Sequence, residues 1–86
     1  MKFTNPEELV GKIVKSVYSG DPTNVNIYFV SGMVKNNYKL IFLVSHNRYP
    51  VGKLDYIEQE ALIEALNGEY SYHAFRYDWN IVEGKR

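Results

Sequence analysis

The sequence predicts an α+β fold: a mostly antiparallel four-stranded sheet with one short N-terminal helix and one longer helix, in the order α-β-β-β-α-β. Three observations predict this class. Residues 70–82 alternate at period two, as a half-buried strand does. Residues 13–44 hold three β-rich segments separated by turn residues, and residues 56–66 have the spacing of an amphipathic helix. At 86 residues, we expect a single domain over residues 1–86.

The composition narrows the classes of function. The chain has no cysteine, which excludes disulfides, thiolate nucleophiles and cysteine-ligated metals. Ten Lys and Arg balance ten Asp and Glu, so the net charge gives no reason to expect tight, non-specific DNA binding. The start of the sequence lacks the apolar run of a signal peptide, and no segment has the roughly 18 to 20 apolar residues of a membrane span. We therefore expect a cytoplasmic protein without membrane contact.

The N-terminal helix is expected from a cluster of capping residues. Asn5 is a favoured N-cap, Pro6 suits the first helical position, and Glu8 stands three residues after the cap. Gly11 follows as a stop signal. These residues predict a helix of one or two turns that ends near Val10.

Three consecutive strands are expected at residues 13–19, 25–35 and 38–44. Residues 20–24 form a strong turn signal between the first two strands. Asn36 and Asn37 can take the positive φ angles of a tight hairpin turn, which joins the second strand to the third. Ser31 and Gly32 predict a β-bulge in the second strand.

The third of these strands is apolar on both faces, the pattern of a central strand or of one covered on both sides. With a turn at Asn36 and Asn37, the expected core face carries Phe29, Leu40, Phe42 and Val44. The opposite face carries Tyr28, Val30, Ile41 and Leu43, subject to a shift at the bulge. Two helices of these lengths cover only one face of such a sheet, so the other face is expected to contact a partner or a second subunit. The predicted binding residues on this strand pair are Tyr28, Ile41 and Leu43.

The longer helix is expected over residues 56–66. Asp55 and Glu58 have the spacing of a capping box, and Asn67 with Gly68 supplies a left-handed end. The expected core face gathers Ile57, Ala61, Leu62, Ala65 and Leu66. Tyr56 and Ile63 fall on the far side, where they form either two scattered exposed residues or a small protein-docking stripe.

The last strand, residues 70–82, carries aromatic side chains on both faces. The face expected to pack on the core carries Phe75, Tyr77, Trp79 and Ile81. The other face carries Tyr70, Tyr72, Ala74, Arg76, Asp78 and Asn80. Because tyrosine and arginine are enriched at binding surfaces, we predict that Tyr70, Tyr72 and Arg76 contact a partner.

Residues 45–53 form a loop with hydrogen-bond donors, an aromatic ring and positive charge, so its predicted contact residues are His46, Asn47, Arg48 and Tyr49. The alternative is a solvated connection between strand and helix. His46 and His73 are the two histidines, and such a pair can act as acid and base in phosphodiester cleavage, but nothing in their spacing requires it. The sequence contains no metal-ligand motif and no nucleotide-binding glycine loop. We expect no catalytic residue, no metal and no cofactor.

These features predict a small non-enzymatic protein-binding module, which self-associates as a homodimer or acts as a regulator or inhibitor of a larger partner. An inhibitor encoded by a phage or mobile element suits the size and composition. The alternative is a single-stranded nucleic-acid-binding protein, in which sheet tyrosines stack on bases and basic residues meet phosphates. The residues for that role are Tyr28, Tyr38, Tyr70 or Tyr72, with Lys39, Arg48 and Arg76. The neutral net charge makes this alternative the less favoured of the two.

Overall fold

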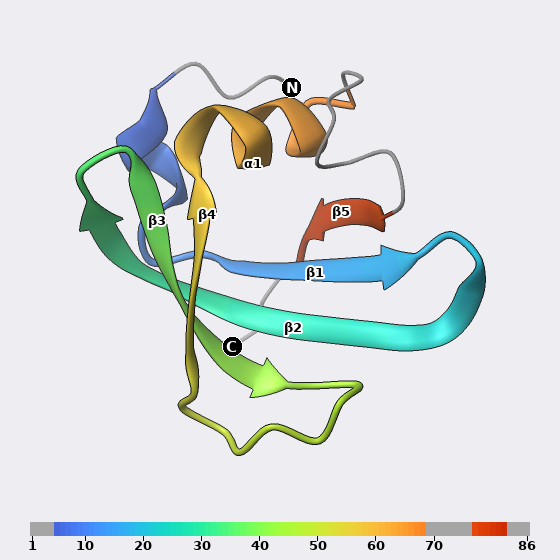
Figure 1. Ribbon diagram of the computed structural model, residues 1–86. Coiled ribbons are helices and arrows are strands. Elements are labelled where there is room, and N and C mark those ends of the chain that lie inside the picture. Colours follow the sequence, from blue (N-terminus) through green and yellow to red (C-terminus); the bar gives the residue numbers. More distant parts are fainter. Residues whose placement is uncertain (1–4, 69–76, 83–86) are drawn as a thin grey trace.

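The computed structural model describes residues 5–68 and 77–82 of the chain. Within these residues, five strands form one antiparallel sheet in the order β4-β3-β2-β1-β5 (Figure 1). The elements along the chain are a 3-10 helix η1 (Pro6–Leu9), β1 (Ile13–Tyr18), β2 (Asp21–Val34), β3 (Asn37–Val44), β4 (Leu54–Glu58), α1 (Gln59–Leu66) and β5 (Tyr77–Ile81). The α+β class and the antiparallel sheet are confirmed, whereas the predicted number and order of elements are wrong.

Strand β4 (Leu54–Glu58) is the element that the sequence prediction missed. It pairs with β3, where Ile41 lies opposite Leu54 and Asn37 lies opposite Glu58. Helix α1 consequently begins at Gln59 and not at residue 56. The start of α1 is tied to the β2–β3 turn, because the Gln59 backbone N–H donates to the Asn36 carbonyl at 2.8 Å. Strand pairing has overridden the local capping signal, as tertiary context commonly does.

The predicted capping box at Asp55 and Glu58 is also wrong. The Asp55 carboxylate accepts a hydrogen bond from the Tyr56 backbone N–H at 2.9 Å, within β4. Glu58 is the N-cap residue of α1, but its side chain makes no capping hydrogen bond. The residues that resembled a helix start are therefore part of the sheet.

The predicted N-terminal helix is present as a single 3-10 turn. The Asn5 side chain accepts a hydrogen bond from the Glu7 backbone N–H at 3.0 Å, and Pro6 occupies the first helical position. Gly11 follows with a φ of 90°, a backbone conformation that glycine adopts without strain. Its N–H donates to the Val30 carbonyl at 2.7 Å, which attaches this end of the chain to β2.

Both hairpin turns lie earlier in the chain than predicted. Tyr18 pairs with Asp21, so Ser19 and Gly20 form the β1–β2 turn, and β2 already begins at Asp21. Val34 pairs with Asn37, which leaves Lys35 and Asn36 as the β2–β3 turn. Lys35 has the positive φ, at 57°, that the asparagines were expected to supply.

The predicted bulge in β2 is confirmed, and it inverts one of the face assignments. Val30 pairs with Leu40 and Gly32 with Lys39, so Ser31 is the extra residue. This shift places Tyr28 and Val30 on the same face as Leu40. The prediction that Tyr28 and Val30 face away from the core is therefore wrong, as is the placement of Phe29 and Val44 in the core; Phe29 is only partly buried and Val44 is exposed.

The core lies between the sheet and α1, on what we call the inner face of the sheet. Its buried cluster contains Leu9, Val14, Tyr28, Val30, Tyr38, Leu40, Phe42 and Leu62. Helix α1 contacts both edge strands, β4 and β5, and lies across the space between them (Figure 1). Ile63 packs against this core, and Tyr56 belongs to β4, so the predicted docking stripe of Tyr56 and Ile63 on one helix face is wrong.

Strand β5 (Tyr77–Ile81) pairs with β1 and follows the predicted alternation. Tyr77, Trp79 and Ile81 are partly buried, with Trp79 and Ile81 packed against the core, whereas Asp78 and Asn80 are exposed. The predicted binding residues Tyr70, Tyr72 and Arg76 lie outside the described residues, as does His73.

Candidate functional site

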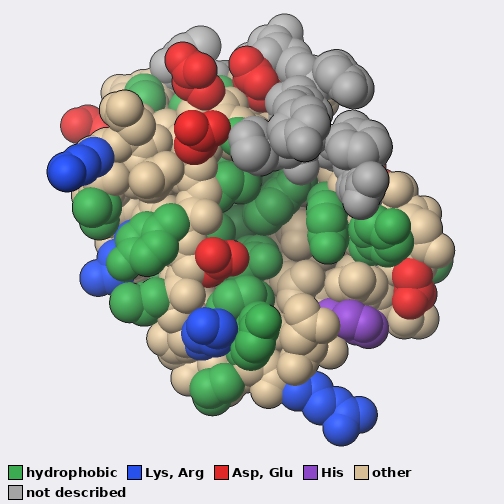
Figure 2. Space-filling model, viewed as in Figure 1, with side chains coloured by type: hydrophobic (Ala, Val, Ile, Leu, Met, Phe, Trp, Pro, Cys, Tyr) green, Lys and Arg blue, Asp and Glu red, His purple; other side chains and the backbone are tan. Residues whose placement is uncertain are grey.

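A pocket of about 310 Å³ opens on the inner face of the sheet, between β4 and β5. Figure 2 shows a hollow in the middle of this side of the molecule, lined by hydrophobic side chains. We call it the inner pocket. Its aromatic lining residues are Tyr28, Phe42, Tyr49, Tyr56, Tyr77 and Trp79. Its polar side chains are Ser16, Asn26, Asn47 and Asp55.

The aromatic rings form a continuous row centred on Tyr28. The ring of Tyr28 is stacked on Trp79, with 5.8 Å between centroids and 20° between planes. The centroids of Tyr28 and Phe42 are 4.6 Å apart. Phe42 in turn contacts the ring of Tyr49 edge-on, with 5.4 Å between centroids. The sheet register explains the centre of the row, because Tyr28 and Phe42 lie directly opposite each other on β2 and β3. Only the ends of the row, Trp79 and Tyr49, are available to a ligand, since Tyr28 is 7% exposed.

Two buried polar side chains line the pocket together with the rings. Ser16 and Asn26 are paired residues of β1 and β2, and both are buried. The Asn26 side-chain oxygen accepts a hydrogen bond from the His46 backbone N–H at 3.0 Å. This bond fixes the start of the β3–β4 loop, which carries Asn47 and Tyr49 to the pocket. Among the described residues, every buried side-chain nitrogen and oxygen has a hydrogen-bond partner.

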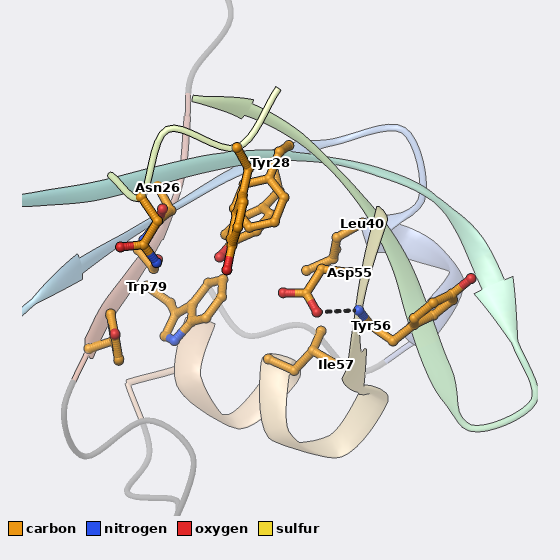
Figure 3. Close-up of a pocket in the computed structure, with 12 residues that line it drawn as sticks. Asn26, Tyr28, Leu40, Asp55, Tyr56, Ile57 and Trp79 are labelled. Atoms are coloured by element: carbon orange, nitrogen blue, oxygen red, sulfur yellow. Dashed lines mark hydrogen bonds between the residues drawn. The ribbon is translucent and has the colours of Figure 1, made fainter. Parts of the chain in front are cut away.

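Asp55 is the one charged side chain among the described residues that line the pocket. Strand alternation turns its carboxylate toward the phenol of Tyr28, while the ring of Tyr56 points away from the cavity (Figure 3). Burial raises the pKa of Tyr28 to about 12, and the negative charge of Asp55 adds to this effect. A hydrogen bond with Ser16 acts in the opposite direction on the pKa. The pocket therefore combines neutral aromatic walls with one negative charge.

The raised pKa of Tyr28 predicts a loss of stability in alkaline solution. In the unfolded chain a tyrosine loses its proton near pH 10, whereas folded Tyr28 keeps it until about pH 12. Between these pH values, loss of the proton stabilises the unfolded state alone. The contribution of Tyr28 to the free energy of unfolding is therefore complete below pH 10 and decreases by at most about 1.4 kcal/mol per pH unit above it. Urea unfolding at several pH values between 9 and 12 measures this slope.

Tyr28→Phe is the control for the alkaline effect, because it keeps the ring and removes the ionising group. Its unfolding free energy should fall less steeply with pH than that of the wild type. The slope that remains includes Tyr38, whose pKa burial also raises to about 12. Parallel slopes for the two proteins would show that Tyr28 ionises as readily in the folded chain as in the unfolded chain.

Only some of the predicted contact residues of the loop at residues 45–53 lie at the pocket. Asn47 and Tyr49 line the pocket, whereas His46 and Arg48 are exposed and do not belong to its lining. Tyr49 is 44% exposed at the rim. The Lys53 ammonium lies 4.9 Å from the centroid of the Tyr49 ring, within the range of a cation–π contact.

The predicted binding residues of β3 lie on the opposite, outer face of the sheet. Ile41 and Leu43 are partly buried there, in the same alternation that buries Leu40 and Phe42 on the inner face. Strand β3 is therefore apolar on both faces, as predicted. The outer face and the inner pocket are separate surfaces, and Tyr28 belongs to the second one.

Asp55, Ser16 and Asn26 are pocket residues that the sequence prediction missed, and Trp79 and Tyr77 were assigned to the core alone. Asp55 has only a weak local signal, because residues 54–56 alternate between apolar and charged side chains but Ile57 interrupts the alternation. Ser16 and Asn26 carry no such signal, since each is a single polar residue within a β-rich segment.

Other kinds of site find no support in the described part of the chain. There, no group of three or more His, Asp or Glu side chains is placed to hold a metal ion. No helix within residues 5–68 or 77–82 is long and apolar enough to cross a membrane. Comparison with protein-family models, curated protein sequences and solved structures finds no match to this chain.

Proposed function

We propose that this protein is a small non-enzymatic binding module that captures an exposed segment of a protein partner in the inner pocket. The observation that carries the proposal is the row of aromatic rings ending at Trp79 and Tyr49, open to solvent at the rim. Large aromatic side chains contribute most of the binding energy at protein interfaces. A module of this kind acts by occupying its partner, which fits a regulator or inhibitor of a larger protein.

The nucleic-acid alternative receives less support from the same residues. Of its four predicted stacking residues, Tyr28 and Tyr38 are buried in the core, and Tyr70 and Tyr72 lie outside the described residues. The Tyr38 hydroxyl donates a hydrogen bond to the Pro6 carbonyl. Asp55 at the pocket would repel phosphate groups, which bind to positive surfaces. We therefore favour a protein segment as the occupant.

A random peptide library displayed on phage tests the proposal. Enriched peptides are synthesised, and their binding is followed by the fluorescence of Trp79, which is the one tryptophan of the chain and lies on the pocket wall. Tyr49→Ser should weaken binding at least about tenfold, because it removes an aromatic anchor at the rim.

Val34→Ser is the control, since Val34 is an exposed apolar side chain, at 45%, that does not line the pocket. Its affinity for the peptides should remain that of the wild type. Enriched peptides that bind Tyr49→Ser as well as the wild type would rule out the inner pocket as the binding site.

Self-association through the outer face remains a second prediction. It rests on the partly buried apolar residues Ile41 and Leu43, which face away from α1. Sedimentation equilibrium of the purified protein measures the mass in solution, and a mass that stays at 10.0 kDa up to high concentration would exclude a homodimer.

A further inference from the structure

The chemistry of the inner pocket indicates which group of a partner it holds, and this inference rests on the proposed function. We propose that the pocket selects a cation on an aliphatic stem, the ammonium group of a lysine side chain in the partner. The carboxylate of Asp55 and the outer rings of the aromatic row, Trp79 and Tyr49, are the groups that would receive it.

The first support for this proposal is the combination of rings and charge. The faces of aromatic rings carry negative electrostatic potential and attract ammonium groups, and pockets lined by several rings recognise alkylated ammonium ligands. Asp55 adds a full negative charge, and no lysine or arginine is among the described residues that line the pocket. An anionic group would be repelled, and a neutral apolar group would not supply a positive charge opposite the carboxylate.

The second support is the arrangement of Asp55 itself. One of its oxygens accepts the hydrogen bond from the Tyr56 backbone N–H at 2.9 Å, which holds the carboxylate in place. The carboxylate points into the cavity, beside the phenol of Tyr28 (Figure 3). The phenol is neutral at physiological pH, as an ordinary tyrosine is. Asp55 is therefore the one negatively charged side chain among the described residues that line the pocket.

The third support is an ammonium group that the chain already places on one of these rings. Lys53 lies with its ammonium nitrogen 4.9 Å from the centroid of Tyr49. This contact shows that the ring of Tyr49 binds an ammonium group on a four-carbon stem, and a lysine of the partner would take the place of Lys53 there. The volume of about 310 Å³ is at the lower end of the range of ligand pockets, about 300 to 1,000 Å³, which suits a single side chain.

Two short peptides isolate the charge. One is a capped tripeptide with a central lysine, and the other has norleucine in its place, which keeps the aliphatic stem and removes the ammonium group. Binding is followed by Trp79 fluorescence and by amide chemical shifts. We expect the lysine peptide to bind at least about tenfold more tightly, the effect of one charge-assisted contact. Equal affinities for the two peptides would overturn the proposal.

Asp55→Asn assigns this preference to the carboxylate, because it preserves the shape of the side chain and removes its charge. The lysine preference should fall to about twofold or less in this variant. Asp78→Asn is the matched control: Asp78 is an exposed aspartate of β5 that pairs with Val17 and alternates away from Trp79. It should retain the full preference. Circular dichroism verifies that both variants are folded, and an unchanged lysine preference in Asp55→Asn would overturn the assignment.

Butylammonium and butyrate complete the experiment. Weaker binding of butylammonium than of the lysine peptide identifies a protein side chain as the source of the cation, whereas equal binding identifies a free amine. Butyrate should not bind, and binding as tight as that of butylammonium would overturn the cation preference. This result can be told apart from a failure of the proposed function. If library peptides without lysine bind and their binding still depends on Tyr49, the protein is a binding module but does not select an ammonium group.

Discussion

Tyr38→Ala is expected to lower the free energy of unfolding by about 3 to 5 kcal/mol, because it leaves a large cavity in the core. Tyr38 is the largest side chain of the fully buried core, at 0% exposure. Its ring packs in the cluster that joins η1, the sheet and α1. For a chain of this length the total stability is about 4 to 13 kcal/mol, so the variant should be close to unfolding. Urea unfolding followed by circular dichroism measures the loss.

Tyr38→Phe separates the ring from its hydroxyl group. The phenylalanine keeps the packing and removes the hydrogen bond to the Pro6 carbonyl, which should cost only about 1 kcal/mol. If Tyr38→Phe lowers the free energy of unfolding as much as Tyr38→Ala does, the stability comes from the hydroxyl group and not from the ring. A loss below about 1 kcal/mol for Tyr38→Ala would show that Tyr38 does not lie in a close-packed core.

Trp79→Ala is expected to cost about 3 kcal/mol, at the lower end of the range for a truncated tryptophan because Trp79 is only partly buried. The substitution removes the ring stacked on Tyr28 and a large part of the contact between β5 and the core. The reduced stability should appear as a lower urea midpoint with an unchanged slope. The measurement uses circular dichroism, since the variant has no tryptophan left to fluoresce.

The neighbouring Asn80→Ala is the control for Trp79, because Asn80 is exposed on the opposite face of the same strand. It should change the stability by less than about 0.5 kcal/mol. Equal effects of the two substitutions would mean that β5 does not keep a fixed face toward the core. The sequence also predicts that Tyr72 and Arg76 contribute to partner binding. Both residues lie outside the described part of the chain, so this remains a prediction.

Period-two patterning predicted the strands well where one face is clearly more apolar than the other. Trp79 and Ile81 were placed on the core face because they alternate with Asp78 and Asn80, and the structure confirms this placement. The Ser31 bulge was also predicted from its residues. The predicted faces were given without applying the shift at the bulge, although a shift of one residue moves every following side chain to the other face. This is why Tyr28 was assigned to the outer face.

The inner pocket could not be predicted from the sequence, for two physical reasons. Its residues come from β1, β2, β3, β4, β5 and the β3–β4 loop, and the sheet order that brings them together depends on long-range pairing. Asp55 moreover carried a competing local signal, since aspartate three residues before glutamate also resembles a helix start. Pairing with β3 decided between strand and helix, and that pairing is not visible within the segment itself.

The pairing of β5 with β1 has a consequence for the order in which the protein becomes functional during synthesis. Val14 lies opposite Ile81, so β1 is synthesised before its second neighbour in the sheet. Strands β1 to β4 are consecutive in the sheet, but one edge of β1 stays unpaired until residues 77–81 are present. Because Trp79 forms a wall of the inner pocket, a nascent chain that ends before it would have the sheet without the finished binding site.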